Sequence, residues 1–245
     1  MNLALVHALE RATLNALPAP RTLFDGPFVV KAFLGGTGRA NGAWSLDPSP
    51  DPHLPERVTR IEAHYRRFGL VPRIRSSPLD PPGLSEILRG EGWLDDGESV
   101  VNSGPLEPRA DSAVEFLTAP NTNWLAVIGT AAYQSAARKA EKEQAVKLFA
   151  IPAAWMILHE GGVPVAAMST TCDCAFYGIF DLAVRPEFRR RGFAARIIGA
   201  AAHWGAARGA GIGFAQTDVT NLASIALQTG LGLRERYRYR YFLKP

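Results

Sequence analysis

The sequence predicts an α/β fold in which a mixed, mainly antiparallel sheet is flanked by helices. Residues 155–159 and 163–170 are apolar runs joined by Glu-Gly-Gly at 160–162, which is typical of a β-hairpin, and residues 176–184 read as a third antiparallel strand. A helical pattern over residues 193–204 follows these strands. Strands and helices in this order indicate a sheet covered by helices.

Prolines and glycines divide the first half of the chain into short elements. The turn at 35–38, Gly-Gly-Thr-Gly, joins the first two strands, and apolar residues at helical spacing between Val58 and Phe68 indicate a helix. In chain order we expect strands at 28–34 and 43–46, a helix at 56–68, a strand at 73–75, a helix around 84–88 and a strand around 99–101.

The second half begins with helical stretches between residues 110 and 148, and the later stretch is rich in Ala, Lys and Glu. After the three strands comes a helix whose apolar face carries Phe193, Ile197, Ala201 and Trp204. The remaining elements are a strand at 212–217, a helix at 222–228 ended by Gly230, and a terminal strand rich in Tyr and Arg.

The two halves show a weak internal repeat. A strand ends at Leu-Asp-Pro (46–48) in the first half and at Val-Arg-Pro (184–186) in the second, and each is followed by helix, strand and helix. Gly-Trp at 92–93 then corresponds to Gly-Leu at 232–233. Similar spacing of similar elements predicts two copies of one fold, at residues 1–108 and 109–245. The alternative for residues 1–108 is an unrelated cap.

The composition of the 245-residue chain is that of a globular protein, with 47% hydrophobic and 20% charged residues. No run approaches the roughly 20 apolar residues that cross a bilayer, and Glu10 and Arg11 stand where a signal peptide would be apolar. We therefore expect a cytoplasmic protein. Cys172 and Cys174 are expected to be reduced, mostly buried thiols, and the five histidines show no metal-ligand spacing.

The stretch from Asp181 to Arg196 carries the clearest chemical signal, because a strand passes through a proline turn into a helix with a basic, glycine-bearing start. Unpaired N–H groups at a helix start and the helix dipole bind anions, and Gly192 lets a phosphate approach without a Cβ in the way. The stretch is neither a Walker loop nor a three-glycine dinucleotide turn. The net charge of +4 is compatible with a polyanionic cofactor.

This stretch resembles the signature of the GNAT acyl-CoA N-acyltransferases, Arg/Gln-x-x-Gly-x-Gly/Ala after an aliphatic-x-Val-x-Pro strand end. The resemblance continues through 221–227 and 230–233, which look like the family's second CoA-contacting helix, and covers about residues 150–245 well. The residues that match the signature are Leu182, Val184, Pro186, Arg189, Gly192 and Ala194.

The resemblance implies a GNAT-type fold and an acetyl-CoA-dependent N-acetyltransferase that acts on a primary amine by direct attack. Amides of about residues 190–195 would hold the pyrophosphate, and the strand at 182–184 and Asn221 would bind the pantetheine arm. The implied cofactor residues are Leu182, Ala183, Val184, Arg189, Arg190, Arg191, Gly192, Phe193, Ala194, Ala195, Asn221 and Ser224. In the first copy prolines at 48, 50, 52 and 55 replace the required N–H groups, so we expect no CoA there.

Direct attack requires a base, because an amine with a pKa of about 10.4 is protonated at neutral pH. Alternation along 176–184 would put Tyr177, Ile179 and Asp181 on one face, which could open on the acceptor cleft. We therefore predict Asp181 as the base. The alternative is that Asp181 makes only a structural hydrogen bond.

The residue that would protonate the leaving thiolate differs from the family's usual tyrosine. Gln228 stands where many family members carry a tyrosine, and Gln216 where some carry a catalytic glutamate. Tyr177 and Tyr239 are our candidates, with core packing as the alternative role; Tyr237 and Tyr241 share the face of Tyr239.

Candidate acceptor-binding residues are Arg39, Asn41 and Trp124, which fall in or near predicted loops. For Arg39 and Asn41 the alternative is an ordinary hairpin turn. A competing function is a CoA-binding sensor or pseudoenzyme, which Gln228 and Gln216 would favour. A weaker one is nucleic-acid binding by the arginine-rich end, although no RNA-binding aromatic motif accompanies it. A homodimer is possible, and no membrane partner is expected.

Overall fold

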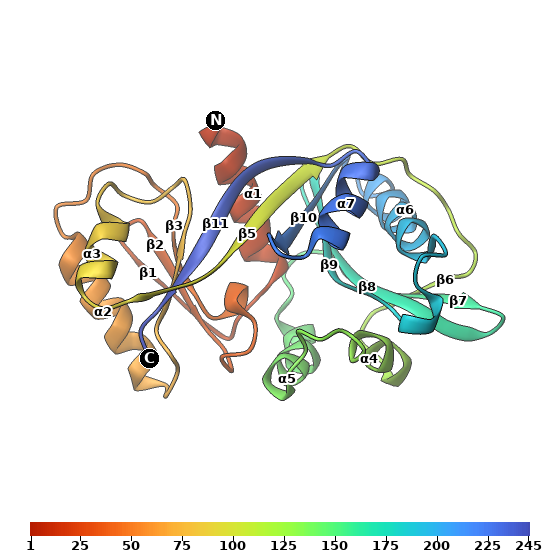
Figure 1. Cartoon of the computed structure of the whole chain (residues 1–245), viewed down its shortest axis with the longest axis horizontal. Helices are drawn as coiled ribbons and strands as arrows, with labels where there is room; N and C mark the ends of the chain where they lie inside the picture. The colour runs from red at the N-terminus through yellow and green to blue at the C-terminus, as the bar shows by residue number, and fades with distance from the viewer.

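The computed structural model describes all 245 residues and contains one sheet of eleven strands, in the order β1-β2-β3-β4-β11-β5-β10-β9-β8-β7-β6 (Figure 1). The strands are β1 (Arg21–Asp25), β2 (Phe28–Ala32), β3 (Ala43–Ser45), β4 (Arg73–Ser76), β5 (Leu94–Gly104), β6 (Val114–Leu117), β7 (Ala153–Glu160), β8 (Val163–Asp173), β9 (Phe176–Val184), β10 (Ile212–Asp218) and β11 (Arg234–Leu243). The helices are α1 (Leu3–Ala16), α2 (Leu54–Arg67), α3 (Leu84–Gly90), α4 (Thr122–Ile128), α5 (Ala136–Ala145), α6 (Phe193–Ala206) and α7 (Leu222–Gly230), with 3-10 turns η1 (Gly38–Ala40), η2 (Val146–Leu148) and η3 (Pro186–Phe188).

The predicted fold class is confirmed. Only β3 with β4 and β9 with β10 pair in parallel, and all other neighbours are antiparallel. The predicted hairpin of β7 and β8 forms, and β9 pairs antiparallel with β8. No helix is long and apolar enough to cross a membrane.

The terminal strands of the two halves are exchanged within the sheet. β5, which ends the first half, lies between β10 and β11, and β11 lies between β4 and β5. Figure 1 shows β5 and β11 running together through the middle of the molecule. The predicted boundary at residue 108 therefore separates two series of elements along the chain, while the sheet itself is continuous across them.

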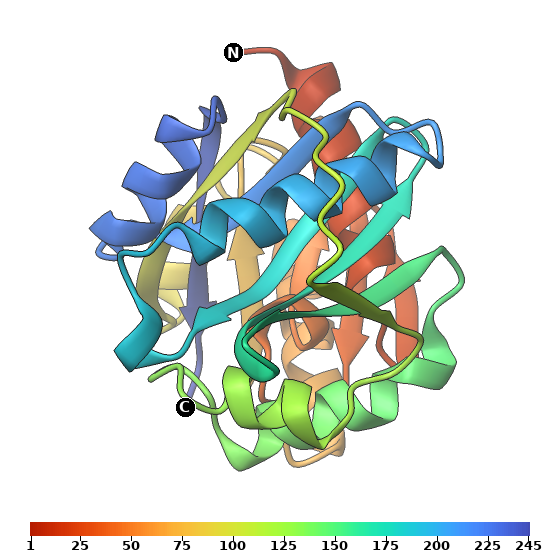
Figure 2. The same cartoon turned by 90° about the vertical axis from the view of Figure 1, so that its right-hand side faces the viewer.

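Helices cover both faces of the second half of the sheet. On one face α6 packs on β8 and β9, and the cluster includes Ile197, Met168 and Ile179. On the other face α1 packs against Phe180 and Phe214, and α4 covers β7 and β8. Figure 2 shows α6 crossing in front of the strands, with α4 and α5 below.

Helix α1 is the main element that our sequence prediction missed. Asn2 caps it by accepting a hydrogen bond from the Leu5 N–H, and Val6, Leu9 and Ala16 are buried. Its Glu10 is fully buried, and both carboxylate oxygens accept from the buried Arg75 guanidinium of β4. This ion pair fixes α1 to β4 within the first half, while α1 itself also packs on β8 and β9 of the second half.

The two cysteines are free, as predicted. Cys172 is buried, but Cys174 is exposed in the turn that follows β8, so the expectation of a buried pair is correct for one thiol only.

Candidate active site

A cavity of about 640 Å³ opens where β9 and β10 separate. Pairing between the two strands runs only from Phe176 to Ile179 on β9. On β10, Ala215 is the last residue that pairs with β9. Beyond this point the lining includes Ile198 and Leu227, from the face that α6 and α7 cover, and Phe180 and Tyr239, from the face that α1 covers. Side chains of both sheet faces thus line one cavity.

A bulge in β9 places Asp181 in this cavity. The pairing with β8 shifts register at this point, and Asp181 has a φ of +54°, in the left-handed region. The bulge interrupts strict alternation, so Phe180, Asp181 and Leu182 all line the cavity.

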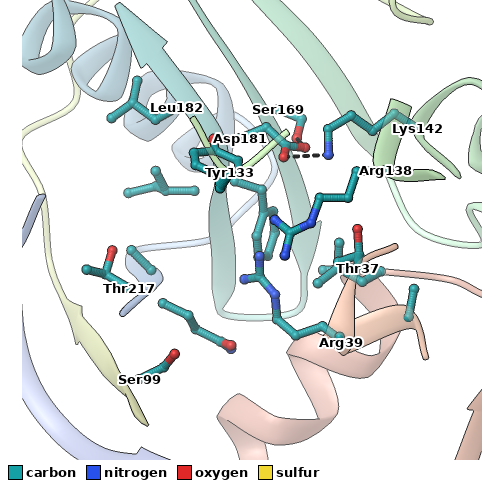
Figure 3. A pocket seen from close by; sticks show the side chains of 18 of the residues that line it. Thr37, Arg39, Ser99, Tyr133, Arg138, Lys142, Ser169, Asp181, Leu182 and Thr217 are labelled. Atoms are coloured by element: carbon teal, nitrogen blue, oxygen red, sulfur yellow. Dashed lines mark hydrogen bonds and ion pairs between the residues drawn. The ribbon is translucent and has the colours of Figure 1, made fainter. Parts of the chain in front are cut away.

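The carboxylate of Asp181 is held by two neighbours. Lys142 Nζ of α5 lies 2.8 Å from one carboxylate oxygen, and the Ser169 hydroxyl of β8 lies 3.3 Å from the other (Figure 3). The side chain of Asp181 is 16% exposed, so it is sheltered without being sealed from the cavity. This arrangement orients a negative charge toward the splayed strands.

Tyr177 lies outside the cavity, which corrects its predicted position. Its side chain packs on the α6 face, where a Cβ at Gly205 would lie 2.7 Å from the tyrosine ring. Its buried hydroxyl has no partner, and burial raises its pKa. Because the bulge at Asp181 interrupts the alternation, Tyr177 and Asp181 do not share a surface.

Trp124 and Asn41 are also placed differently from the acceptor-binding roles we expected. Trp124 is fully buried under β7 to β9 and donates its indole N–H to the Met168 carbonyl at 2.9 Å. Asn41 is 2% exposed, and its Oδ1 accepts from the N–H groups of Phe33 and Gly35. Neither residue lines the cavity.

Glu141 of α5, which the sequence analysis did not identify, holds the loop that carries Arg39. Its carboxylate is 3% exposed and accepts from the N–H groups of Leu34, Gly36 and Thr37 and from the Asn41 side chain. A Cβ at Gly36 would lie 2.6 Å from the Arg138 nitrogen, so glycine permits the close approach of loop and helix. A tertiary contact between residues a hundred positions apart leaves no local signal.

We expect Glu141→Gln to destabilise the protein by about 2 to 4 kcal/mol, because it weakens charge-assisted hydrogen bonds and directs an amide N–H₂ at a backbone donor. Urea unfolding would measure the change. Glu143→Gln, on the exposed face of the same helix, should leave the midpoint unchanged. An unchanged midpoint for Glu141→Gln would contradict the role we assign to this carboxylate.

Arg39 and two further residues lie around Asp181. Arg39 lines the cavity with its guanidinium 5.5 Å from the Phe180 ring centroid. Tyr133 and Arg138, which our sequence analysis missed, line it as well, with the Arg138 guanidinium 5.6 Å from the Tyr133 ring. Tyr133 is 44% exposed; its partial burial and the Asp181 charge raise its pKa, and both arginines oppose this shift.

The start of α6 presents a row of free amides. Gly192 is the N-cap with a φ of +82°, and no backbone carbonyl or side chain accepts a hydrogen bond from the N–H groups of residues 190–195. The segment 189–192 is exposed. The 3-10 turn η3 joins this segment to β9, whose residues 182–184 have no partner on the side of β10.

The polar groups at the start of α7 make more hydrogen bonds within the chain than those at the start of α6. Asn221 lines the cavity, but its Oδ1 caps the helix by accepting from the Ser224 N–H at 3.1 Å. Gln228 is 5% exposed; it donates to the Thr217 and Ser224 hydroxyls and accepts from Asn102. Gln228 therefore fixes α7 to β10 and β5.

The tyrosines of β11 differ in their surroundings. Tyr237 donates to the buried Glu10 and is not available to the cavity. Tyr239 lines the cavity beneath the Arg75 guanidinium, which lies 3.2 Å from its ring centroid, and its hydroxyl has no hydrogen-bond partner in the chain. Gln216 also lines the cavity, between Arg75 and Thr13.

Comparison with known proteins supports one family. The model of a family described as "Probable histone acetyltransferase Rv0428c C-terminal" matches residues 4–242. No curated protein matches the sequence.

Similar solved structures share the fold over nearly the whole chain. A GCN5-related N-acetyltransferase from Kribbella flavida is 16% identical, with a TM-score of 0.70 over 99% of this chain and 95% of its own. A putative GNAT-family acetyltransferase from Novosphingobium aromaticivorans is 18% identical, with a TM-score of 0.59 over 96% of each chain. A tandem GNAT protein from the clavulanic acid biosynthesis pathway is 12% identical, with a TM-score of 0.60 over 96% of this chain and 87% of its own. At these identities the likeness establishes the GNAT fold.

Proposed function

The chain belongs to the family described as probable histone acetyltransferase Rv0428c C-terminal, and from this premise we propose that it is an acetyl-CoA-dependent N-acetyltransferase acting on a primary amine. One observation carries the proposal. A row of unpartnered amides at residues 190–195 lies one 3-10 turn after β9, the strand that borders the splayed cavity.

The proposed CoA site uses groups of this chain only. The amides of residues 190–195 would bind the pyrophosphate, aided by the dipole of α6 and the charges of Arg189 to Arg191. The free backbone edge at 182–184 would pair with the amides of the pantetheine arm. The thioester would then lie between β9 and β10, near Leu182 and Leu227. Ser224 and Asn221 would border the arm at the start of α7.

In the proposed reaction the amine nitrogen attacks the thioester carbon, the new C–N bond forms and the C–S bond breaks. The protonated amine must first lose a proton, at a cost of roughly 5 kcal/mol at pH 7. Asp181 would accept that proton directly or through water. Tyr239, whose hydroxyl is unpartnered at the cavity, would supply a proton to the thiolate.

Tyr239→Phe should lower the rate of acetyl transfer at least tenfold without weakening acetyl-CoA binding, since a general acid contributes to the chemical step. Thiol release under saturating acetyl-CoA would measure it. Tyr177→Phe removes a hydroxyl that is buried outside the cavity, and should retain the normal rate. Equal rates for the two variants would exclude Tyr239 as the acid.

We propose that residues 1–108, the degenerate copy, form the acceptor wall for residues 109–245. In the first copy α2 begins at Leu54 with Pro55 in its first turn, and the segment before it carries Asp47 and Asp51. A helix start with proline and nearby carboxylates is unsuited to a pyrophosphate. The first copy instead supplies Arg39 to the cavity.

A second candidate is a CoA-binding sensor without transferase activity. It is favoured by Gln228, which stands where relatives carry the acid and is fully hydrogen-bonded. Calorimetric titration with acetyl-CoA, combined with a thiol-release assay over a broad amine panel, distinguishes the acetyltransferase from the sensor. Binding with transfer supports the enzyme, and binding without transfer to any amine supports the sensor.

A further inference from the structure

Two arginines in the cavity have no acidic partner. Arg39 of η1 and Arg138 of α5 form no ion pair, whereas Lys142 beside them is paired with Asp181. The only hydrogen bond of the Arg138 side chain runs from Nε to the Gly36 carbonyl at 3.2 Å. In Figure 3 both guanidinium groups point into the same space, beside Asp181 and Tyr133.

The fold fixes these arginines in place despite their mutual repulsion. Arg39 lies in the loop that Glu141 holds through four hydrogen bonds, and Arg138 lies one helical turn before Glu141. Neither guanidinium donates to Glu141, whose oxygens are occupied by other donors. Uncompensated like charges held together in a cavity indicate that an anion completes the site.

The other acids of the cavity lie elsewhere on its wall. Asp96 and Asp218 come from β5 and β10, and Asp218 accepts from the Thr220 amide and hydroxyl. The wall formed by η1 and α5 has one carboxylate, that of Glu141, against Arg39, Arg138 and Lys142, and therefore carries a surplus of positive charge next to the predicted base.

We infer that the acceptor carries a carboxylate as well as its amine, as an amino acid does, and that Arg39 and Arg138 bind this carboxylate. The inference rests on the proposed function and names the substrate class of that same site. Guanidinium groups match a carboxylate through paired N–H donors. An amine on the same molecule could then reach Asp181, across the space that these residues share. A lysine in a basic polypeptide would instead bring more positive charge to the two arginines.

The test compares the standard α-amino acids that carry a primary amine with their amides, as acceptors of the acetyl group from acetyl-CoA, and measures thiol release. We expect kcat/KM to favour the best acid over its amide by roughly 10- to 100-fold, as a charge-assisted contact provides. Arg138→Gln and Arg39→Gln should bring that ratio toward one, mainly through KM. Arg11→Gln, an exposed arginine without ion pairs on α1, is the control.

A second readout does not depend on turnover. Calorimetry would compare binding of the N-acetyl amino acids and their amides to wild type and to the Arg39→Gln/Arg138→Gln double variant, with and without CoA. Tighter binding of the acids, lost in the double variant, supports the inference. The inference is overturned if amino acids and their amides have equal kcat/KM values or equal affinities. It is also overturned if the arginine variants lower these values equally for acids and amides. Failure of acetyl-CoA itself to bind would instead refute the proposed function, and titration without CoA would still test the arginine pair.

Discussion

Gly192→Asp should eliminate micromolar acetyl-CoA binding and leave the fold intact. Gly192 has a φ of +82° and open space where a Cβ would lie, and Asp tolerates this conformation better than most residues. The new carboxylate would stand at the start of α6, against the proposed pyrophosphate. Losing two charge-assisted hydrogen bonds of about 1.5 to 3 kcal/mol each weakens binding by roughly 100-fold or more. Calorimetric titration would measure the change.

The chain offers a matched control for this substitution. Gly209 has a φ of +83°, also faces open space, and lies just beyond the other end of α6. Gly209→Asp introduces the same strain and charge, and should bind acetyl-CoA as the wild type does. Gly192→Asn separates charge from side-chain volume and should give an intermediate loss. Normal binding by Gly192→Asp would remove α6 as the pyrophosphate site.

The features that the sequence predicted well are encoded over short distances. The hairpin of β7 and β8 follows from two apolar runs around Gly161 and Gly162, both of which have positive φ. The start of α6 follows from Gly192 and the basic residues before it. Such signals depend on backbone preferences of neighbouring residues, so they are visible without tertiary information.

The features that it missed depend on contacts between distant residues. Alternation along β9 put Tyr177 and Asp181 together, but the bulge at Asp181 places them in different surroundings. Asn41 looked like an ordinary turn residue or a ligand contact, and only the buried Glu141 explains its role. The exchange of β5 and β11 between the halves is likewise a property of the assembled sheet.

Asp181→Asn should lower acetyl transfer by roughly 10²- to 10⁴-fold, which is the usual contribution of a general base. Asn is nearly the same size, tolerates the φ of +54° at this position and can still accept from Ser169. Acetyl-CoA binding should therefore persist, because the proposed pyrophosphate site on α6 is untouched. Single-turnover transfer with bound acetyl-CoA measures the chemical step separately from binding.

Lys142→Met distinguishes a catalytic carboxylate from a structural ion pair. Both substitutions remove the ion pair between Lys142 and Asp181, whose atoms lie 2.8 Å apart, but only Asp181→Asn removes the proton acceptor. If Asp181 is the base, Lys142→Met retains most of the transfer rate, since the carboxylate remains beside Ser169 at the splayed strands. Similar losses for the two variants, or a normal rate for Asp181→Asn, would show that the pair only fixes α5 against β9, and the proton would then have to leave through water or another group.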